Sequence, residues 1–453
     1  MSFNEYGSYS DDVKKLLKGI DARVFDKVRV HLKSGQVLEG LVLPRPEYGS
    51  LDCLVIKLDN GYNVGIHINN IERIELVAKG VEAVIKYPPP PSKVAELPKV
   101  AVLGTGGTIL SKVDYVSGAV YPTFSAEDIY GMVPELQDLA NLDIEMVFSI
   151  FSEDMTPQHW EKLAQVIERK FRNGCRGIVV FHGTDTMGYS AAAMAFAVRN
   201  APGPVVFVGA QRSSDRPSTD AVMNVICAVT VAVKAPFAES VVCMHGESGD
   251  TYALVHRGVR VRKMHTSRRD AFRSINDIPL AKVEGSEIVV INRKYIPRSK
   301  SIDDMICMPK FDNKTVLLKF YPGMQPDIID YLVDKGYHGI VLEGTGLGHV
   351  GQQLLKSIRR AIEMGIPVVM TSQCLYGRIN MNVYRRGVEL LKMGVIPGHD
   401  MLPETAYVKL SWVLAQTRDL DEVRKLMTAP IVYEINPTTS YVTYPQVYQE
   451  VTM

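Results

Sequence analysis

The chain has 453 residues, of which 46% are hydrophobic and 22% charged, and its formal net charge is +1 at pH 7. This length allows about three domains with sizeable cores, and the composition is ordinary for a soluble globular protein. The near-neutral charge argues against a large nucleic-acid-binding surface, although a local basic patch is compatible with it. Since no apolar run approaches the ~20 residues of a membrane span and the amino terminus lacks signal-peptide regions, we expect a cytoplasmic protein.

The cysteine and histidine patterns point away from disulfides and metals. The six cysteines include no C-x-x-C pair, so we expect neither a disulfide framework nor a zinc site. Four of them lie beside or within apolar stretches and are expected to be buried free thiols: Cys175, Cys227, Cys243 and Cys374. No histidine pairing or carboxylate cluster has metal-ligand spacing. We expect neither a metal nor a cofactor in this chain.

Residues 1–87 favour a short helix followed by a small all-β barrel of the SH3-like kind. The helix is expected over Asp11 to Ile20, where apolar residues fall on one side. From residue 26 to 77 short alternating segments, such as Val28–Leu32 and Leu54–Leu58, are separated by hairpin-type turns. About five such strands suit a small barrel. Four consecutive prolines then predict a semi-rigid linker over 88–98, because they favour extended polyproline II.

After the linker the pattern becomes strand, turn, helix, which predicts two α/β domains. The first is expected over 99–291 as a doubly wound parallel sheet, because its strands read as continuous apolar runs. Its strands are expected at Val100–Leu103, Ile144–Ile150, Ile178–Phe181 and Val205–Val208, and its helices near 157–172 and 191–198. A connector over 292–314 leads to the second domain, 315–453. There the expected strands are Val316–Phe320, Gly339–Leu342 and Pro367–Met370, with helices near 328–334 and 352–364.

Two threonine-containing turns each follow a buried strand of the first α/β domain. They are Thr105-Gly106-Gly107-Thr108-Ile109 and His182-Gly183-Thr184-Asp185-Thr186-Met187. The carboxyl ends of parallel strands form the ligand crevice of an open sheet. Two potential nucleophiles are therefore expected at one site, which suggests acyl chemistry on a small substrate.

A threonine hydroxyl is a poor nucleophile until a nearby base removes its proton. Asp185 directly follows Thr184, and Lys263 lies in the basic stretch 257–269. A lysine normally titrates near ~10.4, so a free amine requires desolvation or nearby positive charge. We expect Arg260 and Arg262 to provide that charge and Asp185 to orient the ammonium, as in the serine–lysine variant of the catalytic triad.

Three further residues are candidates for substrate contacts. The glycines of the first motif, Gly107 among them, allow close approach of the backbone, and their amides could face a developing oxyanion. Ser152 and Glu153 follow a third strand of the same sheet and could hold the polar end of an amino acid. Glu153 would suit an α-ammonium group.

Simpler interpretations exist for each motif. The first is not a dinucleotide loop, because Ile109 stands where G-x-G-x-x-G requires its third glycine, and no Walker-type motif occurs. The second could be a helix cap, since Thr and Asp are favoured there. The basic stretch around Lys263 could be a solvated face, and His182 could be a buried structural histidine.

The two motifs resemble the signature motifs of bacterial-type L-asparaginases. The similarity runs from about Lys99 to beyond Lys409, and Ser152-Glu153-Asp154-Met155 is similar to that family's substrate-binding turn. The resemblance implies Thr108 as the first nucleophile and Thr184 as the second catalytic threonine, with Asp185 and Lys263 as the base system. It also implies an assisting tyrosine, either Tyr115 or Tyr121.

Simple asparaginases start almost directly at the Gly-Gly-Thr strand, whereas this chain carries residues 1–98 before it. An asparaginase-like body behind a small barrel is similar to the D subunits of archaeal glutamyl-tRNA(Gln) amidotransferases. The resemblance implies hydrolysis of glutamine, with ammonia passed to the E subunit of the same complex. That partner would bind Glu-tRNA(Gln) and use ATP and magnesium to form Gln-tRNA(Gln). It also implies a homodimer of this chain at the core of a heterotetramer.

Two departures from free asparaginases leave the substrate open. Gly188-Tyr189-Ser190 lacks the acidic residue that usually follows the second motif, and Glu343-Gly344-Thr345-Gly346-Leu347-Gly348 lacks an asparagine that often contacts substrate. The alternatives are a free-standing L-asparaginase with an accessory barrel, or a non-catalytic amino-acid-binding module. The sequence does not decide which threonine attacks first or whether glutamine or asparagine is preferred.

Overall fold

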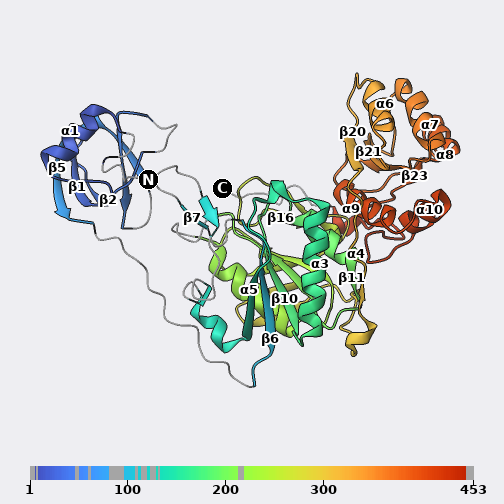
Figure 1. Ribbon diagram of the computed structural model, residues 1–453, viewed down its shortest axis with the longest axis horizontal. Helices are drawn as coiled ribbons and strands as arrows, with labels where there is room; N and C mark the ends of the chain where they lie inside the picture. The colour runs from blue at the N-terminus through green and yellow to red at the C-terminus, as the bar shows by residue number, and fades with distance from the viewer. Residues whose placement is uncertain are drawn as a thin grey trace. The chain divides into compact units, whose positions relative to one another are not determined.

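The computed structural model describes residues 6, 9–45, 50–59, 63–80, 96–107, 111–113, 120–122, 129–130, 133–212 and 219–444. These residues divide into two compact units. The first holds the N-terminal domain with the described parts of 106–134 and 210–222, and the second holds both α/β domains. Figure 1 shows them coloured along the chain. None of the described helices is long and apolar enough to cross a membrane.

The N-terminal domain is a five-stranded antiparallel sheet with one helix. The helix α1 (Asp11–Gly19) begins after Ser10, whose Oγ accepts a hydrogen bond from the Val13 amide. The strands pair in the order β4-β3-β2-β1-β5. They are β1 (Lys27–Leu32), β2 (Val37–Val42), β3 (Cys53–Leu58), β4 (Asn63–His67) and β5 (Ile71–Ala78). Alternate strand residues such as Val28 and Ile56 pack with α1 in one core, which confirms a small β-rich domain.

The larger α/β domain is built on an eight-stranded sheet in the order β18-β17-β14-β13-β12-β10-β6-β9. Its parallel strands are β6 (Lys99–Gly104), β9 (Asn141–Met146), β10 (Gly177–Phe181), β12 (Val205–Val208) and β13 (Ser240–His245). Three antiparallel strands complete one edge: β14 (Ala253–Arg257), β17 (Ala281–Glu284) and β18 (Glu287–Val290). The doubly wound fold is confirmed, with a mixed rather than purely parallel sheet.

Helices cover both faces of this sheet (Figure 1). The helices α3 (Pro157–Arg172) and α4 (Met187–Ala197) share a core cluster with Leu103 and Val180 of the central strands. The helix α5 (Ala221–Lys234) packs on the opposite face. Its approach to β10 is so close that a Cβ at Gly177 would lie 2.4 Å from the carbonyl oxygen of Ala232. Both faces of the central strands are therefore buried, which explains their continuous apolar sequences.

The C-terminal α/β domain has a four-stranded parallel sheet in chain order. Its strands are β20 (Thr315–Lys319), β21 (Gly339–Gly344), β22 (Val368–Ser372) and β23 (Ile396–Pro397). Its helices are α6 (Asp327–Asp334), α7 (Leu355–Glu363), α8 (Arg385–Met393), α9 (Pro403–Leu414) and α10 (Leu420–Thr428). The Trp412 ring of α9 stacks on Phe196 of α4, so α9 joins this domain to the larger one.

Short elements complete the described chain. They are the antiparallel pairs β7 (Ser111–Val113) with β8 (Val120–Pro122), β11 (Val198–Arg199) with β19 (Ile306–Cys307), and β15 (Val261–Lys263) with β16 (Phe272–Ser274). The 3-10 turns near the threonine motifs are η4 (Ser152–Asp154) and η5 (Gly258–Arg260). The expected connector thus contributes β19, which pairs with β11. Residues 88–95 of the expected linker lie outside the described residues.

Two expectations about local structure were wrong. The strand expected at 144–150 is Asn141–Met146; after it the amides of both Val147 and Phe148 donate to the single carbonyl of Gly104, so the regular register ends there. Cys374 is exposed rather than buried, since it lies beyond the end of β22. All six cysteines are free thiols.

Candidate active site

Lys263 lies at the end of β15 and joins two residues of the second threonine motif. Its Nζ donates hydrogen bonds to Thr184 Oγ1 at 2.8 Å and to Asp185 Oδ1 at 2.9 Å. The lysine side chain is 13% exposed, whereas that of Asp185 is 70% exposed. The amine therefore lies within proton-transfer distance of a buried hydroxyl, and a carboxylate fixes its direction.

The turn that carries Thr184 is held against η4. Thr186 Oγ1 donates a hydrogen bond of 2.6 Å to the carbonyl of Ser152. A Cβ at Gly183 would lie 2.7 Å from the Ser152 Cβ, so this close approach requires glycine. The N-cap of α4 is Thr186, without a side-chain capping bond. Thr184 is thus not a helix cap, and its hydroxyl faces the lysine instead. The helix-cap interpretation of the second motif applies by position to Thr186, but no pattern in the sequence indicated its hydrogen bond to Ser152.

The first threonine motif begins with a structural residue. Thr105 is buried, and both its amide and its Oγ1 donate to the carbonyl of Phe181, at 3.0 and 2.8 Å. Gly106 and Gly107 follow with φ of +103° and +89°, a region that strongly favours glycine. Thr108 and Tyr115 lie outside the described residues, and Tyr121 is described only as part of β8.

The two expected substrate-binding residues differ in exposure. Ser152 is buried beneath the second motif, where it lies close to Gly183. Glu153 is exposed on the same turn. Within the described part of the chain, Glu153 has no hydrogen-bond or ion-pair partner.

The charges expected to act on Lys263 are neutralised by other groups. Arg260 is fully buried and its Nη1 lies 3.1 Å from Asp400 Oδ2. Arg262 Nη2 lies 3.1 Å from Glu404 Oε1. Successive side chains of a strand point to opposite faces, so Arg262 points away from the face on which Lys263 meets Thr184. The expectation that these arginines supply positive charge to the lysine was therefore wrong.

Comparison with known proteins identifies the family. Residues 99–295 match the model for asparaginase, N-terminal; residues 314–427 match the glutaminase/asparaginase C-terminal domain; and residues 22–77 match the GatD N-terminal domain. A relative from Thermofilum pendens, named as the D subunit of glutamyl-tRNA(Gln) amidotransferase, is 54% identical over 96% of this chain and 98% of its own length. This chain belongs to the family of glutamyl-tRNA(Gln) amidotransferase D subunits. A second D subunit, from Pyrococcus abyssi, is 52% identical over 95% of this chain and 99% of its own length.

Solved structures of L-asparaginases have the same two α/β domains as this member of the D-subunit family. The thermostable L-asparaginase from Thermococcus kodakarensis superposes with a TM-score of 0.68 at 33% identity, and covers 75% of this chain and 100% of its own. L-asparaginase I from Vibrio cholerae gives a TM-score of 0.66 at 28% identity, with 75% and 99% covered. These likenesses confirm an asparaginase-like pair of α/β domains.

His182 has a structural role in this D-subunit homologue. Its Nδ1 lies 2.7 Å from the carbonyl of Gly183 and its Nε2 2.8 Å from Ser190 Oγ. Ser190 Oγ also accepts from Trp160 Nε1 at 3.0 Å. Burial lowers the pKa of His182 to about 4, so the ring is neutral and can donate to the carbonyl while it accepts from the serine.

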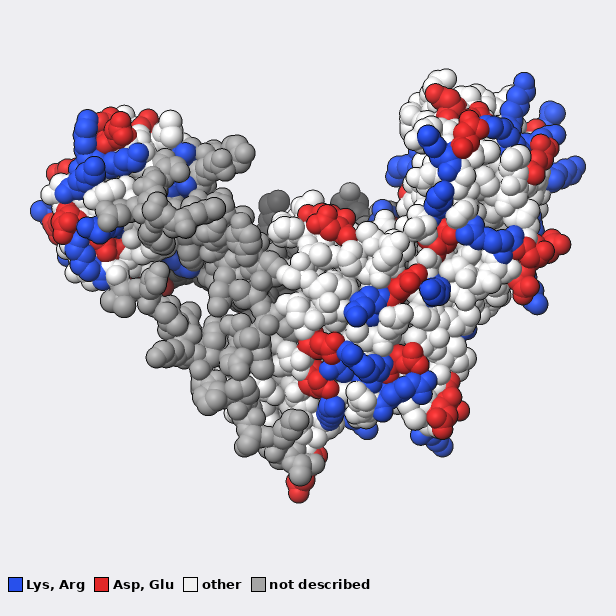
Figure 2. Space-filling model, in the orientation of Figure 1, with Lys and Arg blue, Asp and Glu red and all other residues white. Residues whose placement is uncertain are grey.

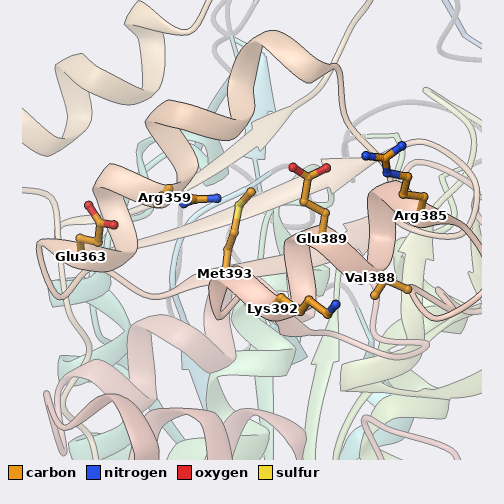
Figure 3. Close-up of a pocket in the computed structure, with 7 residues that line it drawn as sticks. All are labelled: Arg359, Glu363, Arg385, Val388, Glu389, Lys392 and Met393. Atoms are coloured by element: carbon orange, nitrogen blue, oxygen red, sulfur yellow. The ribbon is translucent and has the colours of Figure 1, made fainter.

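A groove elsewhere on the molecule carries different chemistry. It has a volume of 630 Å³ and lies along α7 and α8 of the C-terminal domain (Figure 3). Charged side chains dominate its lining: Arg359, Glu363, Arg385, Val388, Glu389, Lys392 and Met393. It contains no threonine and is not the threonine site. Figure 2 shows basic and acidic side chains interspersed over the visible face, in keeping with the near-zero net charge.

Proposed function

We propose that this chain is the glutaminase subunit of a tRNA-dependent amidotransferase. It releases ammonia from the side-chain amide of glutamine for the conversion of Glu-tRNA(Gln) to Gln-tRNA(Gln). One observation carries the proposal: Lys263 Nζ lies 2.8 Å from Thr184 Oγ1 and 2.9 Å from Asp185 Oδ1. Relatives that match nearly the whole chain are named for this complex, which supports the same assignment.

The proposed reaction begins with proton transfer from a threonine hydroxyl to the neutral amine of Lys263. The lysine donates to Thr184 Oγ1 when charged; when neutral, its lone pair can accept the hydroxyl proton over the same distance. Thr184, Asp185 and Lys263 form the proton relay in this proposal. Thr108 is the attacking threonine, by resemblance to L-asparaginases.

Attack on the amide carbon forms an ester between threonine oxygen and the glutamyl group and breaks the carbon–nitrogen bond. The nitrogen takes a proton from the lysine and leaves as ammonia. Water, deprotonated by the lysine, then hydrolyses the ester and releases glutamate. In this proposal Gly107 contributes an amide to the oxyanion site, Ser152 and Glu153 hold the amino-acid end, and Tyr115 or Tyr121 assists.

The partner of this chain is proposed to be the E subunit of the amidotransferase. That partner would bind Glu-tRNA(Gln), and ATP and magnesium would act there rather than in this chain. A homodimer of this chain would form the core of a heterotetramer. In the described residues, no group of three His, Cys, Asp or Glu side chains is placed to hold a metal ion.

The second candidate is a free-standing L-asparaginase, which the superposition on L-asparaginase structures favours. The third is a non-catalytic amino-acid-binding module. The GatD N-terminal domain match at 22–77 favours the amidotransferase over both, since the superposed asparaginases cover only 75% of the chain.

Ammonia release from glutamine and from asparagine, with and without the tRNA-loaded partner, separates the three candidates. We expect glutamine hydrolysis that rises with the partner, and at least about a 100-fold loss of kcat in Lys263→Met, since general base catalysis contributes on that order. Lys27→Met is the matched control, because Lys27 also binds carboxylates but lies in the N-terminal domain. Strong asparagine hydrolysis without a partner would favour the asparaginase. Binding of glutamine without turnover, unchanged in Thr184→Val, would favour the binding module.

A further inference from the structure

His245, at the carboxyl end of β13, lies between two oxygen atoms. The side chain is fully buried. Its Nδ1 is 2.7 Å from Asn224 Oδ1, and its Nε2 is 2.9 Å from Asp250 Oδ1. The orientation of the asparagine is fixed independently, because Asn224 Nδ2 donates to the carbonyl of Gly209 at 3.0 Å. Both ring nitrogens therefore face hydrogen-bond acceptors.

A neutral imidazole can satisfy only one acceptor, because one of its nitrogens carries a lone pair. A lone pair facing either Asn224 Oδ1 or the Asp250 carboxylate would be repelled. The imidazolium, by contrast, donates from both nitrogens and forms an ion pair with Asp250. The hydrogen bond from His245 is the main cause that lowers the pKa of Asp250, and the charge of Arg269 acts in the same direction.

Asp250 connects this ring to the hairpin that carries Lys263. Arg269 Nη1 lies 3.0 Å from Asp250 Oδ1 and 3.3 Å from the carbonyl of Ser248. Arg269 belongs to the turn between β15 and β16, and Lys263 is the last residue of β15. The ion pair therefore fastens the tip of the hairpin to the loop that follows β13.

The turn itself is tightly closed, so its position sets that of Lys263. The Met264 amide donates to the carbonyl of Ala271 at 2.7 Å. His265 Nδ1 accepts from the amides of Ser267 and Arg268, both at 3.1 Å. These hydrogen bonds link the residues that lie between the Arg269 contact and Lys263.

We propose that His245, protonated on both ring nitrogens, Asp250 and Arg269 form a clamp that positions Lys263 against Thr184. None of the three touches the lysine amine in the structure, so they are positioning residues rather than catalytic ones. The expected effect of the clamp on kcat rests on the proposed function. The protonation of His245 does not depend on that function. The clamp gives a structural role to residues 246–250 and 269, which lie outside the two threonine motifs.

Kinetic measurements on the full-length chain with its partner test the clamp. We expect Arg269→Ala and Asp250→Asn to lower kcat for ammonia release about 10-fold with little change in KM, because misplacing a catalytic group slows the step rather than substrate binding. Arg269→Lys should restore most of kcat. Arg360→Ala is the matched control, since Arg360 also bridges carboxylates, Asp330 and Asp334, but lies on α7. A wild-type kcat in both clamp variants, or a rise in KM alone, would overturn the proposal.

Nitrogen-15 NMR of labelled histidine gives a readout independent of activity, with His245→Gln used to assign the signals. We expect both ring nitrogens of His245 to carry a proton in the wild-type chain, because each of them faces a hydrogen-bond acceptor. A ring nitrogen of His245 without a proton in the wild-type chain would refute the clamp. If the wild-type chain released no ammonia, the proposed function would fail while this spectrum still decided the protonation of His245.

Discussion

Two threonines that follow neighbouring strands have different tasks. Thr105 Oγ1 donates to the carbonyl of Phe181 and joins the carboxyl ends of the paired parallel strands β6 and β10. Thr184 Oγ1 instead accepts from Lys263. The sequence alone predicted that both threonines follow the ends of strands. The structure distinguishes them, because one hydroxyl donates to a backbone carbonyl and the other accepts a hydrogen bond from a lysine. Residue type and position thus predicted a candidate site, whereas the roles of the individual threonines depend on their side-chain partners.

A pH effect on stability follows from His182. Its pKa is about 4 in the folded protein, below the ordinary 6.5, because burial disfavours the charged ring. As the pH falls below 6.5 the unfolded chain binds a proton that the folded chain does not, so folding is weakened down to about pH 4. On going from about pH 7.5 to about pH 5, we expect this residue to cost about 2 kcal/mol of the free energy of unfolding.

Urea unfolding of wild type and His182→Gln at the two pH values measures this contribution. The variant should be less stable at neutral pH and should lose less on acidification. His67→Gln is the control, because His67 is exposed in the N-terminal domain. An equal acid-induced loss in wild type and His182→Gln would show that His182 is not the group responsible.

At the scale of elements, the sequence patterns predicted the strands that are buried on both faces of the sheet. The runs at 178–181 and 205–208 are β10 and β12, because parallel central strands must be apolar throughout. The antiparallel edge was not predicted, since β18 mixes exposed and half-buried residues and resembles a loop in sequence. The clamp was also missed, because His245 meets Asn224, 21 residues earlier along the chain, and Arg269 meets Asp250, 19 residues earlier. No local pattern encodes such contacts.

Lys409 of α9 forms hydrogen bonds with α10 and with the segment that follows α10 in the C-terminal domain. It lies on α9 and, like Glu434, is fully buried. Its Nζ donates to Glu434 Oε1 at 2.5 Å, to the carbonyl of Ala429 at 2.6 Å and to that of Met427 at 3.1 Å. Lys409→Met would leave the carboxylate buried without its counter-charge, so we expect a loss of about 3–5 kcal/mol in the free energy of unfolding.

Denaturant unfolding of Lys409→Met and of the double variant with Glu434→Gln measures that loss. The double variant should recover part of the stability, since no uncompensated charge then remains in the interior. Additive losses in the two substitutions would contradict the assigned pairing.

At the scale of the whole molecule, the N-terminal domain has a core of its own. Among the described residues, the buried members of this core lie between Tyr9 and Ile74, with Val13 and Leu17 of α1 among them. We therefore expect a fragment of residues 1–87 to fold independently. A proton–nitrogen correlation spectrum of the fragment should show dispersed amide signals that match those of the whole chain. A collapsed spectrum would show that the domain needs the rest of the protein.

Arg260 links the C-terminal domain to the segment that carries Lys263. The guanidinium donates to the carbonyls of Asp400 and Tyr433, and it lies three residues before Lys263. A protein shortened after the first α/β domain would leave this buried cation without the acceptors of the second domain and would weaken the support of the segment that leads to Lys263. Although every proposed reacting group precedes residue 264, we therefore expect the smallest active piece of the protein to include Asp400 and Tyr433.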